Sequence, residues 1–86
     1  MLSPTLSRVS LSFTLHARRR MAEYSIQEQD VQDALEDPFA IALSHSGRKI
    51  YQRKLGEYVL RVIVEEEAGI KRIITAYKAR SSRYEL

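Results

Sequence analysis

Arg61 is the residue whose position most strongly suggests chemistry. It interrupts the longest apolar run, Tyr58 to Val64, and a strand there would place it on one face with Val59 and Ile63. A guanidinium in such surroundings needs a partner or an anionic ligand, because an unpaired charge away from water is costly. Two interpretations stay open. Arg61 either binds phosphate or stabilises a transition state, or it reaches water at the sheet edge or pairs with a helix acid.

Tyr77 and His16 are the candidates for proton transfer. Tyr77 falls in the last predicted strand, where Ile73 and Thr75 are expected on its face. It fits equally well a core tyrosine whose hydroxyl reaches water. His16 could act as a general base, or it could be a helix cap or a surface histidine.

Cations are concentrated in the C-terminal half of the chain. The 86 residues carry a net charge of +3, but residues 21–37 hold six acids and no lysine or arginine. Residues 46–64 and residues 70–86 each hold five cations against one acid. Such stretches attract phosphate polyanions. In the C-terminal segment, residues 78–84, the cations could bind a phosphate while Tyr84 stacks on a base. Solvated strand faces are the alternative, and the pattern does not decide between them.

Composition excludes several classes of site. The chain has no cysteine, which removes disulfides and thiolate metal sites, and His16 and His45 are its only imidazoles. Three glycines leave no phosphate-cradling loop, so we expect neither a metal nor another cofactor. No apolar run approaches the roughly 18–20 residues that span a bilayer, so we expect no membrane partner.

Residues 1–20 hold four arginines, four serines and no acid, a composition that resembles an organellar transit peptide. We favour a flexible extension over residues 1–12, which leads into a short strand or extended segment near Leu11 to Leu15. Two helices follow. Ala17, Met21 and Tyr24 recur at helical spacing, and Ser25 with Glu28 predicts a capping box for a helix over about residues 26–36, which Pro38 ends.

The pattern then changes to strands. Residues 50–55, 58–66 and 70–79 are predicted strands joined by tight turns, whereas residues 39–45 have no clear period. Helices grouped before strands indicate an α+β fold. We therefore predict two N-terminal helices packed on a three- to four-stranded antiparallel sheet, in a single domain over residues 13–86.

Several short motifs lie along the chain in this order: His16-Ala17, Arg20-Met21, Ile26, Asp30-Val31, Leu35, Pro38, Leu60-Arg61-Val62-Ile63-Val64 and Ile73-Ile74-Thr75-Ala76-Tyr77. Their order and spacing resemble the bacterial domain-of-unknown-function family 4258, over about residues 13–84. The chain departs from that family at Tyr24, where a second arginine is common, and at Ser25, where glycine is common.

That family is similar to the RelE/ParE-like toxins, and the resemblance implies a RelE-like fold and a cytoplasmic, metal-independent ribonuclease or ribosome-associated module of a toxin–antitoxin type system. Implied partners are RNA or the ribosome and a small antitoxin; a homodimer is a separate expectation that the resemblance does not carry. By position, Arg61 would stabilise the transition state, and Tyr77 or His16 would transfer the proton. The expected RNA contacts are Arg20, Arg48, Lys49, Arg53, Lys54, Lys78, Arg80, Arg83 and Tyr84. The alternative is a non-catalytic module that binds nucleic acid or protein with the same basic sheet face.

Overall fold

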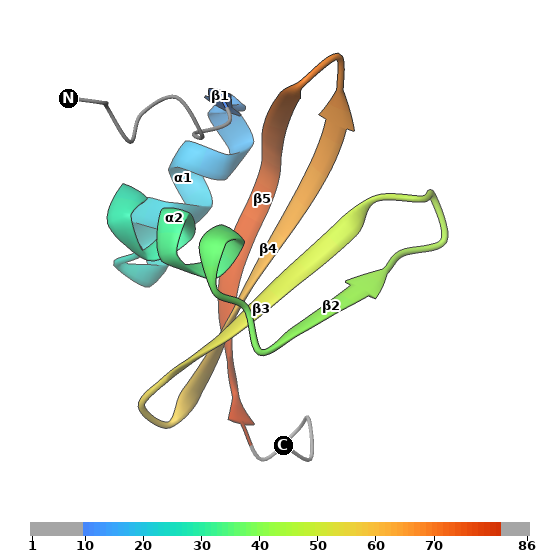
Figure 1. The fold of residues 1–86 in the computed structure, drawn as a ribbon. Helices are drawn as coiled ribbons and strands as arrows, with labels where there is room; N and C mark the ends of the chain where they lie inside the picture. Colours follow the sequence, from blue (N-terminus) through green and yellow to red (C-terminus); the bar gives the residue numbers. More distant parts are fainter. Residues whose placement is uncertain (1–9, 82–86) are drawn as a thin grey trace, which may run out of the picture.

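A five-stranded sheet covered on one face by two helices organises residues 10–81, the part of the chain that this computed structural model describes (Figure 1). The elements, in chain order, are β1 (Ser10–Phe13), α1 (Leu15–Tyr24), α2 (Glu28–Glu36), β2 (Ala40–Leu43), β3 (Lys49–Leu55), β4 (Tyr58–Glu67) and β5 (Ile70–Arg80). Within residues 10–81, no helix has the length and apolar character needed to cross a bilayer.

The sheet is mixed, so the predicted three- to four-stranded antiparallel sheet is wrong, although the α+β class holds. The strand order is β1-β5-β4-β3-β2, and β1 pairs with β5 in parallel, from Ser10 opposite Ile70 to Phe13 opposite Ile73. The predicted meander corresponds to β3, β4 and β5, and the two outer strands, β1 and β2, contain four residues each. Strand β1 overlaps the strand or extended segment predicted near Leu11 to Leu15. Most of the predicted extension, residues 1–9, lies outside the described part.

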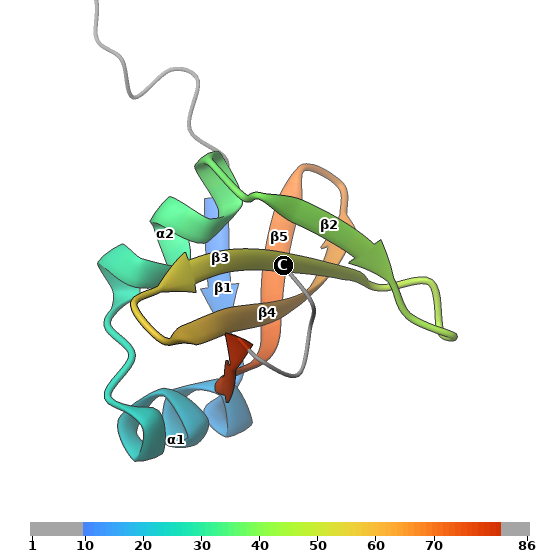
Figure 2. The same cartoon turned by 90° about the horizontal axis from the view of Figure 1, so that it is seen from below.

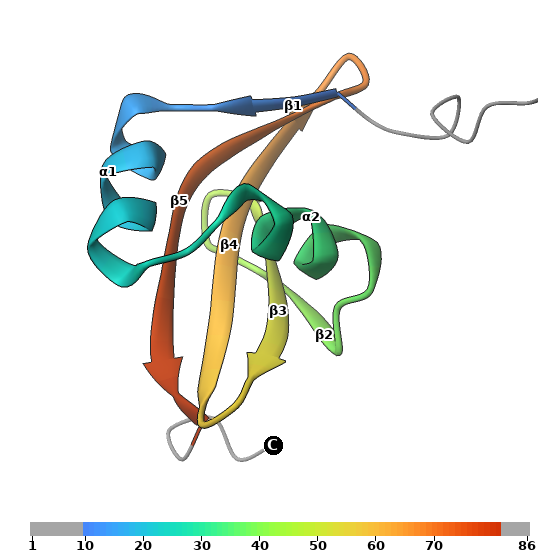
Figure 3. The same ribbon diagram turned by 90° about the vertical axis from the view of Figure 1, so that its left-hand side faces the viewer.

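Both helices pack on the same face of this twisted sheet (Figures 2 and 3). Helix α1 contacts β5, and α2 contacts β3 and β4. Alternate residues of β4 point to the helices and are fully buried, because side chains of a strand alternate between faces. The core comprises Leu60, Val62 and Val64 of β4, Tyr51 of β3, Ile73 and Ala76 of β5, Ala17 and Met21 of α1, and Ile26, Val31 and Ala34 at α2.

Helix α1 is fixed at its start by Thr14. The Thr14 hydroxyl accepts a hydrogen bond from the Ala17 N–H at 2.9 Å and donates to the Ile74 carbonyl of β5 at 3.0 Å. The predicted helical face is confirmed, since Ala17 and Met21 are buried and Tyr24 packs against the core. The cap therefore anchors α1 to the sheet.

The predicted capping box of α2 is wrong. Ser25 ends α1 instead, with a left-handed backbone at φ 57°, and Gln27 is the N-cap of α2. The Gln27 N–H donates to the Asp30 carboxylate at 2.9 Å. Ser25 sits between two helices, and its sequence neighbours alone did not show which helix it terminates. The end of α2 before Pro38 is confirmed.

A β-bulge at Ile74 decides which residues of β5 share a face. Ile73 pairs with Val64, but Thr75 pairs with Ile63, so Ile74 is the extra residue. Ile73 therefore points into the core, and the prediction that it shares a face with Tyr77 is wrong. Val59, Arg61, Ile63, Thr75 and Tyr77 lie on the face turned away from the helices, which we call the open face.

Candidate active site

Arg61 and Tyr77 meet on the open face of the sheet. They are direct cross-strand partners on β4 and β5, and the Arg61 Nη1 donates a hydrogen bond of 2.8 Å to the Tyr77 hydroxyl. The guanidinium carbon lies 5.8 Å from the centroid of the Tyr77 ring. Both side chains are half-buried. The structure thus joins two of the predicted catalytic residues in one pair.

The surroundings of this pair are largely apolar. Val59 and Ile63 flank Arg61 on its own strand, as predicted, and Gln52 of β3 lies opposite it. Half-burial beside apolar side chains lowers the local dielectric, which strengthens the hydrogen bond and the pull of the guanidinium on an anion. Because the Tyr77 oxygen accepts from Arg61, its own O–H can point to a third group. The pair can bind an anion and donate a proton.

His16 does not join this pair. It is exposed near the start of α1, and α1 packs on the opposite face of the sheet. A residue there cannot reach a phosphate held by Arg61, because the sheet lies between them. Of the three predicted catalytic residues, the structure brings together Arg61 and Tyr77 only.

The predicted RNA contacts do not form one basic face. Neighbouring residues of a strand point to opposite sides, so Lys54 lies on the open face with Arg61 whereas Arg53 lies on the helix-covered face. Lys78, opposite the core residue Leu60, also lies on the helix-covered face, and Arg20 is on α1. Arg83 and Tyr84 lie outside the described residues. The charge runs were visible in the sequence, but their division between two faces follows from the strands.

Most of these cations have acidic partners. The pairs are Arg20 with Glu23 at 3.1 Å, Arg48 with Glu65 at 3.6 Å, Lys49 with Glu66 at 3.5 Å, Arg53 with Asp37 at 3.2 Å and Arg80 with Glu57 at 3.4 Å. All are exposed enough to be worth little on their own. A polyanion can therefore exchange with these carboxylates at small cost.

Sequence reasoning missed a polar network on the helix-covered face, centred on Tyr51. The Tyr51 hydroxyl donates to the Glu66 carboxylate at 2.9 Å and accepts from the Lys71 Nζ at 3.1 Å. The Nζ atoms of Lys49 and Lys71 each lie 3.5 Å from a Glu66 oxygen. Glu66 and Lys71 are 15 and 20 residues from Tyr51 and come from other strands, so no local spacing indicates their contact with Tyr51.

The network shifts two pKa values. The hydrogen bond from Tyr51 lowers the pKa of Glu66 below its ordinary value, against the effect of burial and with help from Lys71 and Lys49. Burial alone would lower the pKa of Lys71, but its contacts with Tyr51 and Glu66 raise it above the ordinary value. Both groups are held in their charged forms near neutral pH, which is typical of a structural network.

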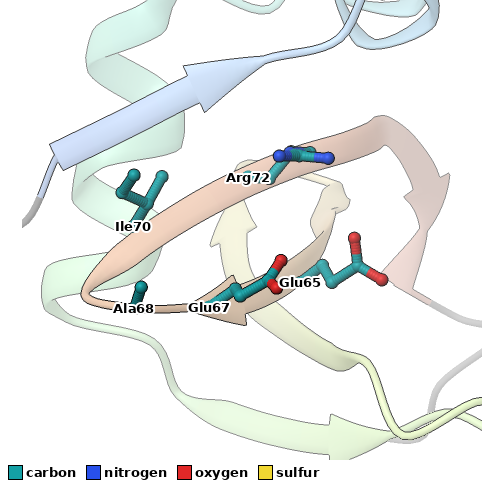
Figure 4. A pocket seen from close by; sticks show the side chains of 5 residues that line it. All are labelled: Glu65, Glu67, Ala68, Ile70 and Arg72. Carbon is teal, nitrogen blue, oxygen red and sulfur yellow. The ribbon is translucent and has the colours of Figure 1, made fainter.

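Two hollows lie at the hairpin between β4 and β5, away from the Arg61–Tyr77 pair. One, of about 160 Å³, is lined by Glu65, Glu67, Ala68, Ile70 and Arg72 (Figure 4). The other, of about 300 Å³, is lined by residues 66–71. Neither includes Arg61 or Tyr77. The candidate active site, the Arg61–Tyr77 pair on the open face, is therefore separate from both of these hollows.

Comparison with known proteins identifies a family for this chain. No curated protein and no solved structure matches the chain. A family model matches residues 13–78, which is most of the chain. This chain belongs to the family described as Domain of unknown function (DUF4258).

Proposed function

We propose that this chain is a toxin-like, metal-independent ribonuclease in which Arg61 and Tyr77 act on a phosphodiester of RNA. The observation that carries the proposal is the 2.8 Å hydrogen bond between these two side chains on the open face. An arginine beside a tyrosine supplies both groups that RNA cleavage needs at the phosphate, a cation and a proton donor. By its resemblance to RelE-like toxins, the chain would be inhibited by binding of a small antitoxin protein.

The proposed reaction begins with attack by the RNA 2′-oxygen on the adjacent phosphorus. A new bond forms between phosphorus and the 2′-oxygen, and the bond from phosphorus to the 5′-oxygen breaks. Arg61 binds the non-bridging oxygens and stabilises the charge that develops on them. Tyr77 gives its hydroxyl proton to the leaving 5′-oxygen, and a solvent base removes the 2′-hydroxyl proton. The products are a 2′,3′-cyclic phosphate and a 5′-hydroxyl, and Tyr77 regains a proton from water.

The test compares single variants on a labelled RNA and on the same strand with 2′-deoxy sugars. We expect cleavage of the RNA only, and a loss of about 10²–10⁴-fold in rate with Tyr77→Phe, which removes the proton donor. Arg61→Lys keeps the positive charge but removes the planar guanidinium and its paired N–H donors, so it should also slow the reaction. Arg18→Lys, at an exposed arginine of α1, is the matched control and should cleave normally. Equal rates for all four proteins, or cleavage of the deoxy strand, would exclude this mechanism.

A growth assay provides a cellular readout. Expression of the wild type should arrest growth, and Arg61→Ala should relieve the arrest while circular dichroism shows a folded chain. Growth that is equally normal, or equally arrested, with both proteins would argue against a toxin.

The second candidate function is a non-catalytic RNA-binding module, and one observation favours it. The predicted RNA contacts are divided between both faces of the sheet and lie in exposed ion pairs, an arrangement that suits loose contact with a polyanion better than a focused active site. This function predicts RNA binding that weakens steeply with salt, without cleavage products. Binding that does not change with salt would exclude it.

A further inference from the structure

Strand β2 is an unprotected edge of the sheet. Its four residues, Ala40 to Leu43, carry no charge, and the structure places no other described strand beyond it (Figure 1). Ile41 is 52% exposed and Leu43 is 73% exposed. Edge strands usually carry a charge, a proline or a bulge that prevents further pairing, and Ala-Ile-Ala-Leu has no such charge or proline. This edge is chemically suited to accept another strand.

The backbone groups on this edge follow from the pairing with β3. The Ser44 N–H donates to the Arg48 carbonyl at 2.9 Å, and the register continues with Ala42 opposite Ile50 and Ala40 opposite Gln52. In an antiparallel ladder, alternate residues bond to the neighbour and the residues between them point away. The N–H and C=O groups of Ile41 and Leu43 are therefore directed to the free edge.

We propose that two copies of this chain associate through β2, antiparallel about a two-fold axis at Ala42. In this register, Ile41 of each copy lies opposite Leu43 of the other, and all outward N–H and C=O groups of these two residues pair. The four apolar side chains then meet on the helix-covered face, where Ile41 and Leu43 already lie opposite Tyr51 and Lys49. Two five-stranded sheets become one continuous sheet.

A second antiparallel register, with the two-fold axis at Ile41, leaves a backbone group of the edge unpaired. It would place Leu43 opposite Phe39 of the second copy, and the Phe39 N–H already donates to the Gln52 carbonyl at 2.9 Å. That register would leave the Leu43 carbonyl without a donor. Of these two registers, the axis at Ala42 pairs more of the outward N–H and C=O groups of Ile41 and Leu43.

Charge favours a second copy over an arbitrary peptide. Asp37, with its side chain 86% exposed, lies before β2, and Arg48, with its side chain 37% exposed, lies after it in the turn to β3. Antiparallel association brings the acidic end of one copy beside the basic end of the other, twice, whereas parallel association would join like ends. The strand is therefore its own complement in both apolar pattern and charge.

Sedimentation equilibrium of the full chain at about 100 µM tests the proposal, since this concentration populates a dimer of micromolar Kd. We expect twice the 10.0 kDa mass of one chain. Ile41→Lys should raise the Kd roughly tenfold or more, because it places a charge in the apolar seam. Leu15→Lys, at a leucine of α1 that is 70% exposed, is the matched control and should remain dimeric. A monomeric wild type, or a dimer that both lysines leave intact, overturns the proposal.

Single cysteines test the register, because the natural chain has none. Ala42→Cys places the two thiols opposite each other in a non-hydrogen-bonded pair, about 4.5 Å apart at Cα, and mild oxidation should link them. Ile41→Cys, one residue away, places its two thiols across from leucines of the opposite copy, beyond the roughly 7 Å Cα limit for a disulfide. A dimer linked equally well by both variants, or by Ile41→Cys alone, contradicts the axis at Ala42.

Discussion

Removing one oxygen atom from Tyr51 tests the energetic role of the network on the helix-covered face. Tyr51 is only 4% exposed, and its hydroxyl both donates to Glu66 and accepts from Lys71. Tyr51→Phe deletes both hydrogen bonds and leaves the packing of the ring unchanged. The variant therefore isolates the polar part of the interaction.

The magnitude follows from the charge and exposure of the partners. A hydrogen bond to a charged group contributes about 1.5–3 kcal/mol when its partner cannot recover water. Here the Glu66 side chain is 37% exposed and the Lys71 side chain 19%, so water replaces part of what each loses. We expect Tyr51→Phe to lower the free energy of unfolding by about 1–2 kcal/mol near neutral pH.

The sign of the pH dependence follows from the lowered pKa of Glu66. Its ordinary value is 4.5, so the stabilisation from its ionised form is complete above that pH. It is lost as the pH falls through the lower pKa of the folded state, because the carboxylate then takes up a proton. The difference between wild type and Tyr51→Phe should therefore be largest near neutral pH and should shrink in acid.

Urea denaturation of both proteins between about pH 7 and pH 3 measures this difference. Tyr58→Phe, at a tyrosine that is 39% exposed, is the control and should change stability by no more than about 0.5 kcal/mol. An NMR titration of the Glu66 carboxyl carbon should show its pKa move back toward the ordinary value in Tyr51→Phe. A loss of stability that is the same at both ends of the pH range, with an unchanged pKa of Glu66, would refute this reasoning.

Three further predictions concern stability and are measured by the same denaturation. Leu60→Ala, at a fully buried side chain, should cost about 2–5 kcal/mol, whereas Leu15→Ala at an exposed one should cost less than about 0.5 kcal/mol; equal losses would contradict the assigned core. Thr14→Ala should cost about 1 kcal/mol, and Thr14→Ser should retain most of the cap; an equal loss in both would exclude the hydroxyl as its source. Ser25→Gly should stabilise the chain by about 0.5–1 kcal/mol, because φ of 57° suits glycine; destabilisation would contradict the left-handed backbone.

The sequence predicted the elements whose signals are local. The period of Ala17, Met21 and Tyr24, the turns at residues 56–57 and 68–69 and the valine-rich run of β4 each determine structure within about ten residues, and these elements are confirmed. The parallel pairing of β1 with β5 depends on residues about 60 positions apart, Ser10 and Ile70 among them. No local period encodes such a pairing, so the strand count was underestimated.

Ser25 shows how one residue type can serve two opposite ends. Serine before a helix normally indicates an N-cap, which is how its spacing from Glu28 was interpreted. The structure makes Ser25 the C-cap of α1, and the next residue, Ile26, is 5% exposed and bonds to the Met21 carbonyl at 2.8 Å. We attribute the role of Ser25 as the C-cap of α1 to the burial of Ile26. Glycine is the residue that most often ends a helix with a left-handed backbone, so serine at this position carried no local signal for a C-cap.

The candidate active site depends on a feature that the sequence did not indicate, the bulge at Ile74. The hairpin register that pairs Glu67 with Ile70 and Val64 with Ile73 would, without a bulge, place Ala76 opposite Arg61 and turn Tyr77 to the helix-covered face. The extra residue moves Tyr77 to the open face and opposite Arg61. The Thr14 hydroxyl, which caps α1, donates a hydrogen bond to the carbonyl of Ile74. The residue that begins α1 therefore also contacts the bulge that brings Tyr77 opposite Arg61. Arg61 and Tyr77 are thus paired by the backbone geometry of the β4–β5 hairpin, which the apolar pattern of neither strand encodes.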